Sequence, residues 1–294
     1  MSKIVSIDGG GTKTLAVLYD ENGQELQRVM KGSSNFAVDV KDALDNLKTT
    51  LNDMNLEDVQ SIHIGLSGYS MVPNKDNLIK DLEKTYHTRV FIYPDAHLGL
   101  YSAYDAKTPL IYVVGGTGSI VYSLVDGQMK RYGGYGHLFG DPGSAYNFVM
   151  DIFKDCLHHL DYGKPLNEVQ QSLLNDLNLT TNEDIIGYTH KVKKQDIAKL
   201  ARNITNHQHP YVLEKIQVQA KLIAQSIIEV SKSINTTKQW MIALRGGFLE
   251  SAPNLKDEVL NILNKNKVNY ILNRDVKEAV YGGYILSKLS KGKE

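Results

Sequence analysis

Apolar runs separated by glycine-rich connections open the chain and predict an antiparallel meander. Residues 3–8 form a mostly apolar run that leads into Gly9-Gly10-Gly11-Thr12-Lys13. A second apolar run covers residues 14–19, and the Asn22-Gly23 pair after it is typical of a hairpin turn. We therefore expect three strands joined by two tight connections, the first of which is a glycine-rich tip.

The same pattern returns at residue 109. An apolar run leads into Gly115-Gly116-Thr117-Gly118-Ser119, a second strand-like run follows, and Asp126-Gly127 turns it into a third. Two copies of one meander indicate an internal repeat. The repeat predicts two related domains, each presenting a glycine tip.

The rest of the chain alternates apolar strand-like runs with segments of helical spacing. Helices are expected at 38–52, 75–86, 96–104 and 275–291, mostly helical structure from 142 to 233, and further strands at 61–66, 88–94, 240–245 and 268–273. Strands that alternate with helices predict an α/β fold in two domains.

Composition narrows the class of protein. The chain has 294 residues, of which 42% are hydrophobic, and its 33 basic and 33 acidic residues give zero net charge. A mixed, neutral surface argues against nucleic acid or an anionic membrane as a partner. No apolar run is long enough to span a membrane and no cleavable leader opens the sequence, so we expect a cytoplasmic protein without a membrane partner.

The first glycine tip fits neither common phosphate loop. A P-loop ends in Gly-Lys-Ser/Thr, but here Lys13 follows Thr12, and a dinucleotide fingerprint would have glycine or alanine in place of Thr14. Both tips join strand to strand. Glycines at such a tip can adopt φ > 0 and let successive N–H groups converge on an anion, and Asp8 ends the strand before it. We favour phosphate binding over the alternative, a tight turn that merely needs glycine.

Six motifs in order resemble one family: "DGGGTKT", "GSSN", "DAH", "GGTGS", "GGYGHLFGDPGSAY" and "LRGGF". Together they resemble the BadF/BadG/BcrA/BcrD ATPase family, in its N-acetylglucosamine kinase branch, within the superfamily of sugar kinases and actin. The resemblance implies two actin-like (ribonuclease H-like) domains with a nucleotide cleft between them. The first would cover residues 1–107, completed by a C-terminal helix at about 275–294, and the second residues 108–274.

The resemblance also implies roles for individual residues. Those implied to bind ATP are Gly10, Gly11, Thr12, Lys13, Gly116, Thr117, Gly118, Ser119, Gly246 and Gly247. Those implied to line the sugar pocket are Ser34, Asn35, Asp95, Thr117, Gly134, Tyr135 and Asp141. Asp95 would also be the catalytic base, and Asp8 would hold Mg²⁺ through its waters.

Simpler interpretations compete with these roles. Asp95 and Asp141 each precede an expected helix and could be N-caps, with Pro142 at the first helical position after Asp141. Ser34 and Asn35 could be turn formers. The family usually has Gly-Asp-Glu-Gly-Ser where this chain has "GDPGS", so Pro142 replaces a carboxylate beside the implied sugar pocket.

The function that the resemblance implies is ATP-dependent phosphorylation of an amino sugar, N-acetylglucosamine at its 6-hydroxyl, with ATP and Mg²⁺ as cofactors. Glucosamine and N-acetylmuramic acid stay open as substrates, and a homodimer stays open as the assembly. Another alternative is a non-kinase activator ATPase of the same family, which bridges two subunits with an iron–sulfur cluster on paired cysteines. Cys156 is the only cysteine of this chain, which argues against that class.

Overall fold

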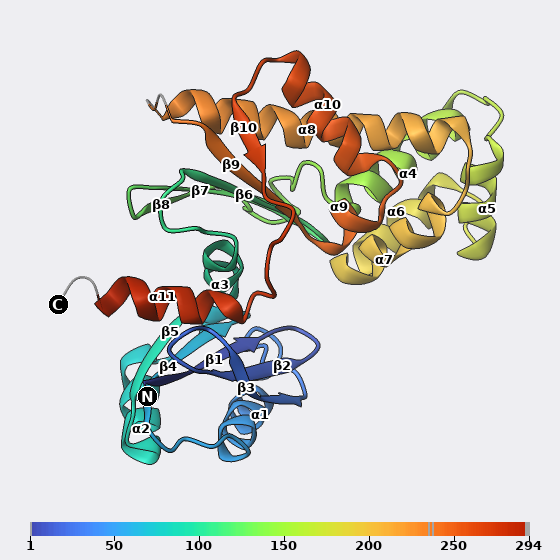
Figure 1. Ribbon diagram of the computed structural model, residues 1–294. Helices are drawn as coiled ribbons and strands as arrows, with labels where there is room; N and C mark the ends of the chain where they lie inside the picture. The colour runs from blue at the N-terminus through green and yellow to red at the C-terminus, as the bar shows by residue number, and fades with distance from the viewer. Residues whose placement is uncertain (1, 235, 237, 292–294) are drawn as a thin grey trace. The chain divides into compact units, whose positions relative to one another are not determined.

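The computed structural model describes residues 2–234, 236 and 238–291, and the chain forms two compact units (Figure 1). Unit 1 comprises residues 1–107 and 274–294, and unit 2 comprises residues 108–273. The C-terminal segment thus belongs to the same unit as the N-terminus.

Unit 1 is built on a five-stranded sheet of order β3-β2-β1-β4-β5. Its strands are β1 (Lys3–Gly9), β2 (Thr14–Tyr19), β3 (Glu25–Lys31), β4 (Val59–Leu66) and β5 (Arg89–Pro94). The first three form the expected antiparallel meander, whereas β1, β4 and β5 run parallel. Because the carboxyl ends of parallel strands meet at one edge, the residues that follow β1, β4 and β5 are brought together there.

Helices cover both faces of this sheet (Figure 1). They are α1 (Val40–Asn52), the 3₁₀ turn η1 (Tyr69–Met71), α2 (Lys75–Tyr86), α3 (Asp95–Ser102) and α11 (Tyr281–Lys291). Alternate residues of β1 point to opposite faces, so Val5 and Ile7 join the core beneath α1 and α2, while Ile4 packs with Tyr284 of α11.

A glycine pair lets α11 approach the sheet closely. A Cβ added to Gly282 would lie 1.9 Å from the carbonyl oxygen of Leu98, and one added to Gly283 would lie 2.1 Å from the Ser6 Oγ atom. No side chain fits at either place. The expected helix over 275–291 is wrong at its start, since α11 begins at Tyr281. Residues 275–280, which we call the strap, belong to no helix or strand. In the strap, the Lys277 carbonyl accepts a hydrogen bond from Ser102, and Glu278 forms an ion pair with Arg28 of β3.

Unit 2 repeats the topology of unit 1, with strand order β10-β9-β6-β7-β8. Its strands are β6 (Leu110–Gly115), β7 (Ser119–Val125), β8 (Gln128–Gly133), β9 (Trp240–Arg245) and β10 (Tyr270–Leu272). An antiparallel meander is again followed by two parallel strands. The internal repeat expected from the two glycine motifs is therefore confirmed as a repeat of topology.

The helices of unit 2 form one large core with its sheet. They are α4 (Ala145–Asp161), α5 (Glu168–Asp176), α6 (Asn182–Lys191), α7 (Lys194–Thr205), α8 (Pro210–Ser233), α9 (Gly247–Ser251) and α10 (Leu255–Lys265). Helix α8 packs against β6, β7 and α10, and α7 packs against α4. The α/β fold predicted from the sequence is confirmed.

Candidate functional site

The first glycine tip joins β1 to β2, and backbone hydrogen bonds of Gly10 hold its base. The Gly10 N–H group donates to the Lys13 carbonyl at 2.9 Å, and the Gly10 carbonyl accepts from the Ser34 N–H group at 3.2 Å. Gly11, Thr12 and Lys13 are exposed. Their backbone groups therefore lie at the surface of unit 1, on a loop that is anchored at its base.

The tip glycines do not use the left-handed conformation that is open to glycine. In the described part of the chain, the backbone angle φ is not positive at Gly10 or Gly11 of the first tip. It is also not positive at Gly116 or Gly118 of the second tip. At some of these positions, a neighbouring atom that leaves no room for a Cβ explains the glycine better than the backbone angle does. A Cβ on Gly118, for example, would lie 2.6 Å from a carboxylate oxygen of Asp141.

Two carboxylates lie beside the first tip. Asp8 in β1 pairs in register with Gly65 of β4, and a Cβ on Gly65 would lie 3.2 Å from the Cα atom of Asp95. Glycine at position 65 thus allows the start of α3, at Asp95 and Leu98, to approach β4 closely. Burial, and then the negative charge of Asp95, raises the pKa of Asp8 to about 6, although nearby Lys13 acts in the opposite direction. Coupled carboxylates of this kind attract a cation or a proton.

Asp95 is not an ordinary N-cap. Pro94 occupies the N-cap position of α3, and Asp95 is the first helical residue. Its Oδ1 atom accepts from the adjacent Ala96 N–H group at 2.8 Å, and the described part of the chain supplies no other hydrogen bond to this carboxylate. The side chain therefore retains acceptor capacity at the carboxyl edge of the sheet.

Ser34 and Asn35 support the first tip from the neighbouring segment. Ser34 is fully buried, and its Oγ atom lies 2.5 Å from Thr14 Oγ1. Asn35 accepts from the Ala37 N–H group at 3.0 Å through Oδ1, while its Nδ2 atom lies 3.6 Å from where a Cβ on Gly11 would stand. Asn35 therefore forms a local turn and also lies beside the tip.

The second glycine tip, between β6 and β7, is held by helix α4. The carbonyls of Gly116 and Thr117 accept from the N–H groups of Ala145 at 2.9 Å and Tyr146 at 3.3 Å. The Ser119 Oγ atom donates to the Pro142 carbonyl at 2.7 Å. The side-chain position at Gly116 is open, with nothing within 4 Å of an added Cβ.

Asp141 does not cap α4, so this expectation is wrong. Ser144 is the N-cap, and its side chain accepts from the Asn147 N–H group. Gly143, at φ +81°, makes a turn between Pro142 and Ser144, which also removes Pro142 from the first helical position. Asp141 instead accepts from Lys194 Nζ at 2.6 Å, a partner that the sequence analysis missed.

Gly246 and Gly247 connect β9 to α9. Gly246 has φ +110°, and a Cβ on it would lie 2.6 Å from the Gly115 carbonyl oxygen. The backbone of β6 therefore already requires glycine at this position. Gly247 has nothing within 4 Å of an added Cβ, so it leaves open space at the start of α9.

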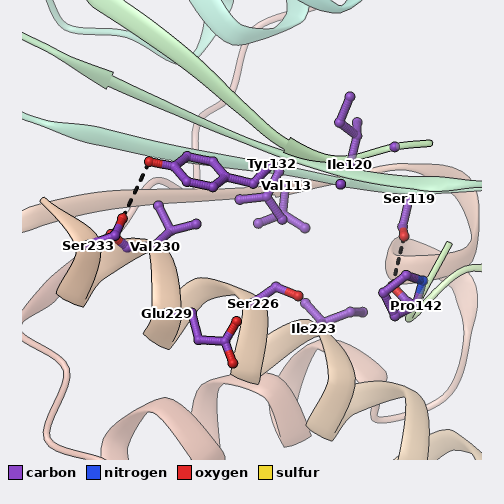
Figure 2. A pocket seen from close by; sticks show the side chains of 13 residues that line it. Val113, Ser119, Ile120, Tyr132, Pro142, Ile223, Ser226, Glu229, Val230 and Ser233 are labelled. Atoms are coloured by element: carbon purple, nitrogen blue, oxygen red, sulfur yellow. Dashed lines mark hydrogen bonds between the residues drawn. The ribbon is translucent and has the colours of Figure 1, made fainter. Parts of the chain in front are cut away.

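Gly134 and Tyr135 begin the loop that follows β8. Tyr135 is 63% exposed, with the Arg131 guanidinium over its ring, and Gly134 packs on Ile120. Gly134 also lines an apolar cavity of about 280 Å³ between the sheet and α8 (Figure 2). Ser119 and Pro142 lie at one end of this cavity, and Tyr132 and Ser233 lie together at the other.

The described part of the chain has neither a metal-binding cluster nor a membrane-spanning helix. It holds no cluster of three or more His, Cys, Asp or Glu residues able to bind a metal, and none of its helices has the length and apolar character needed to cross a membrane. Cys156 is fully buried, which raises the pKa of its thiol to about 12.

Comparisons with known proteins agree over most of the chain. The model of the BadF/BadG/BcrA/BcrD ATPase family matches residues 5–284. An N-acetylmuramic acid/N-acetylglucosamine kinase of Clostridium acetobutylicum is 27% identical, over 98% of this chain and 99% of the relative. An N-acetyl-D-glucosamine kinase of Dictyostelium discoideum is 34% identical, over 69% of each chain.

A solved structure supports the fold. The ROK hexokinase of Thermus thermophilus superposes with a TM-score of 0.63 at 14% identity, covering 99% of this chain and 100% of that one. At this identity the likeness concerns the fold alone, and it confirms the actin-like fold that the motifs implied. With the family model matched over almost its whole length, the chain belongs to the BadF/BadG/BcrA/BcrD ATPase family.

Proposed function

We propose that this chain is an ATP-dependent kinase that phosphorylates an amino sugar, N-acetylglucosamine at its 6-hydroxyl. The observation that carries the proposal is the pair Asp8 and Asp95 at the sheet edge beside the exposed first tip. Two relatives that match most of the chain are named as kinases of N-acetylated amino sugars, which supports the choice of substrate.

Asp95 is the base of the proposed reaction. Phosphoryl transfer asks a protein mainly to align the acceptor and to stabilise the charge on the transferred group. Asp95 accepts the proton of the sugar hydroxyl. The sugar oxygen forms a bond to the γ-phosphorus of ATP while the bond between that phosphorus and the ADP oxygen breaks. It stands at the end of β5 with acceptor capacity left after its one local hydrogen bond.

The two glycine tips are the phosphate-binding elements of the proposal. In unit 1 these are Gly10, Gly11, Thr12 and Lys13, whose ammonium group already acts on Asp8. In unit 2 they are the residues from Gly116 to Ser119. Backbone N–H groups and one lysine would stabilise the charge that develops on the phosphates. Gly247, with its open side-chain position, and Gly246 are assigned to the adenosine.

Asp8 fits a role in holding Mg²⁺. Its raised pKa reflects a carboxylate placed where burial and Asp95 make an unpaired negative charge costly, and a cation would relieve this cost. Mg²⁺ commonly takes only one or two carboxylates and fills its other positions with water and phosphate oxygens. When bound, the ion would neutralise charge on the phosphates.

The sugar pocket is proposed to include six residues besides Asp95. In addition to Asp95 they are Ser34, Asn35, Thr117, Gly134, Tyr135 and Asp141. Glucosamine and N-acetylmuramic acid are the competing acceptors. A pocket that hydrogen-bonds the acetamido group should reject the free amine of glucosamine, because buried polar partners would be left unpaired.

Replacement of Asp95 by Asn tests the proposal. The amide can accept a hydrogen bond from the hydroxyl but cannot take its proton, so turnover should fall by about 10²–10⁴ while sugar affinity changes only a few-fold. Turnover, sugar affinity by calorimetry and melting temperature are measured on one protein. Asp76→Asn is the matched control, since Asp76 also lies in the first turn of a helix. Near-normal turnover in Asp95→Asn would exclude Asp95 as the base.

A further inference from the structure

An ion pair lies directly against the second glycine tip. The Asp141 side chain is 3% exposed, and its Oδ2 atom accepts from Lys194 Nζ at 2.6 Å; the Lys194 side chain is 24% exposed. A Cβ added to Gly118 would lie 2.6 Å from Asp141 Oδ2 and 3.0 Å from Lys194 Nζ. Glycine at position 118 is therefore what allows the pair to contact the tip.

The same carboxylate connects its own loop to helix α7, which begins 53 residues later in the sequence. Its Oδ1 atom accepts from the Gly136 N–H group at 3.2 Å, so it fixes the loop that follows β8. Its Oδ2 atom binds the first residue of α7, a helix that packs against α4. Lys194 thus determines whether this buried carboxylate has a cationic partner.

We propose that Lys194 is a positioning residue for the acceptor sugar, acting through Asp141. It holds the Asp141 carboxylate between Gly118 and Gly136, and thereby orders the loop that carries Gly134 and Tyr135. This inference rests on the proposed function, because it assigns the loop to the sugar pocket. Removal of one partner from a buried ion pair leaves an uncompensated charge, which the surrounding loop must move to solvate.

The backbone hydrogen bonds between the second tip and α4 do not depend on the ion pair. The second tip is held by helix α4, through the hydrogen bonds of Ala145 and Tyr146 to its carbonyls, and neither bond involves Lys194. The tip should keep its shape when the ion pair is lost. The loop at Gly136 depends on Asp141 directly, so the sugar side should suffer more than the nucleotide side.

Lys194→Met tests the inference, since it keeps side-chain length and removes the charge. The dissociation constant of N-acetylglucosamine, measured by calorimetry, should rise by about tenfold or more, and that of a non-hydrolysable ATP analogue by less than about threefold. Lys194→Arg, which keeps the charge, should restore most of the sugar affinity. Lys199→Met is the matched control, because Lys199 forms an exposed ion pair with Asp196 on the same helix. It should leave both dissociation constants unchanged.

Amide hydrogen exchange of residues 133–141 gives a second measurement that does not depend on catalysis. Exchange there should increase in Lys194→Met and not in Lys199→Met. If Lys194→Met does not fold, Lys194→Gln replaces it with the same expectations. Equal weakening of both ligands, a larger loss for the ATP analogue, or behaviour like that of the control would overturn the inference.

The two proposals can fail separately. A wild-type protein that phosphorylates no amino sugar would refute the proposed function and the sugar role of Lys194, while the exchange measurement would still decide whether Lys194 orders the loop. A wild-type kinase whose Lys194→Met variant keeps its sugar affinity would refute the inference alone.

Discussion

The Asp8 carboxylate is held where ionisation is unfavourable. Burial raises its pKa from an ordinary 3.8 to about 6, with a further contribution from Asp95. The folded protein therefore binds this proton more tightly than the unfolded chain does. As pH rises from about 4 to about 6, the unfolded chain releases the proton first, so this residue lowers the stability of the folded state over that range.

Asp8→Asn should remove this loss of stability. In metal-free buffer, the wild-type protein should lose about 1–3 kcal/mol relative to the variant between pH 4 and pH 6, because one pKa unit corresponds to about 1.4 kcal/mol. Urea unfolding at several pH values, with hydrogen exchange of the β1 amides to follow unit 1, measures the difference. Parallel pH dependence in the two proteins would show that Asp8 ionises normally.

At the scale of elements, the close approach of α11 to the sheet of unit 1 depends on Gly282. Gly282→Ala would place a methyl group 1.9 Å from the Leu98 carbonyl oxygen, a backbone atom that can move only with α3. We expect a loss of about 1–3 kcal/mol or more in urea unfolding. Gly187→Ala is the control, because nothing lies within 4 Å of its added Cβ in α6 and the change should stabilise the helix by up to about 1 kcal/mol. Equal stability of the two variants would contradict the packing of α11.

Most elements of the fold could be predicted because local signals and tertiary structure agree. The glycine tips, Asn22-Gly23 and Asp126-Gly127 mark the turns of both meanders, and the strands between them follow as expected. Two helix starts were wrong for tertiary reasons. The strap before α11 is fixed by Arg28 and Ser102, and Gly143 delays the start of α4. Neither set of contacts is visible in local periodicity.

The candidate site was predictable only in part. Asp8 lies next to the end of β1 and Asp95 directly follows β5, and ligands bind at the carboxyl ends of strands in an α/β sheet, so their position could be expected. Lys194 could not be found in this way, because its partner Asp141 lies 53 residues earlier and no spacing rule joins them. Gly65 was missed for a similar reason: its importance lies in the room it leaves beside Asp95.

At the scale of the whole molecule, the cysteine content distinguishes two classes within the family. An activator ATPase of the kind considered above needs paired cysteines for a cluster between two subunits. This chain has one cysteine, and Cys156 is buried in the core of unit 2 with a thiol that resists ionisation. It can neither pair within the chain nor reach a cluster at the surface, which favours the kinase.

We expect this chain to transfer the γ-phosphoryl group of ATP directly to a hydroxyl group of an amino sugar, without hydrolysis of ATP. The direct test incubates the purified protein with ATP and Mg²⁺ and, in separate reactions, N-acetylglucosamine, glucosamine or N-acetylmuramic acid. Products are identified by ³¹P NMR and mass spectrometry. We predict N-acetylglucosamine 6-phosphate in an amount equal to the ADP formed, with glucosamine a much poorer acceptor. ADP release that is the same with and without each sugar, and no sugar phosphate, would contradict the account.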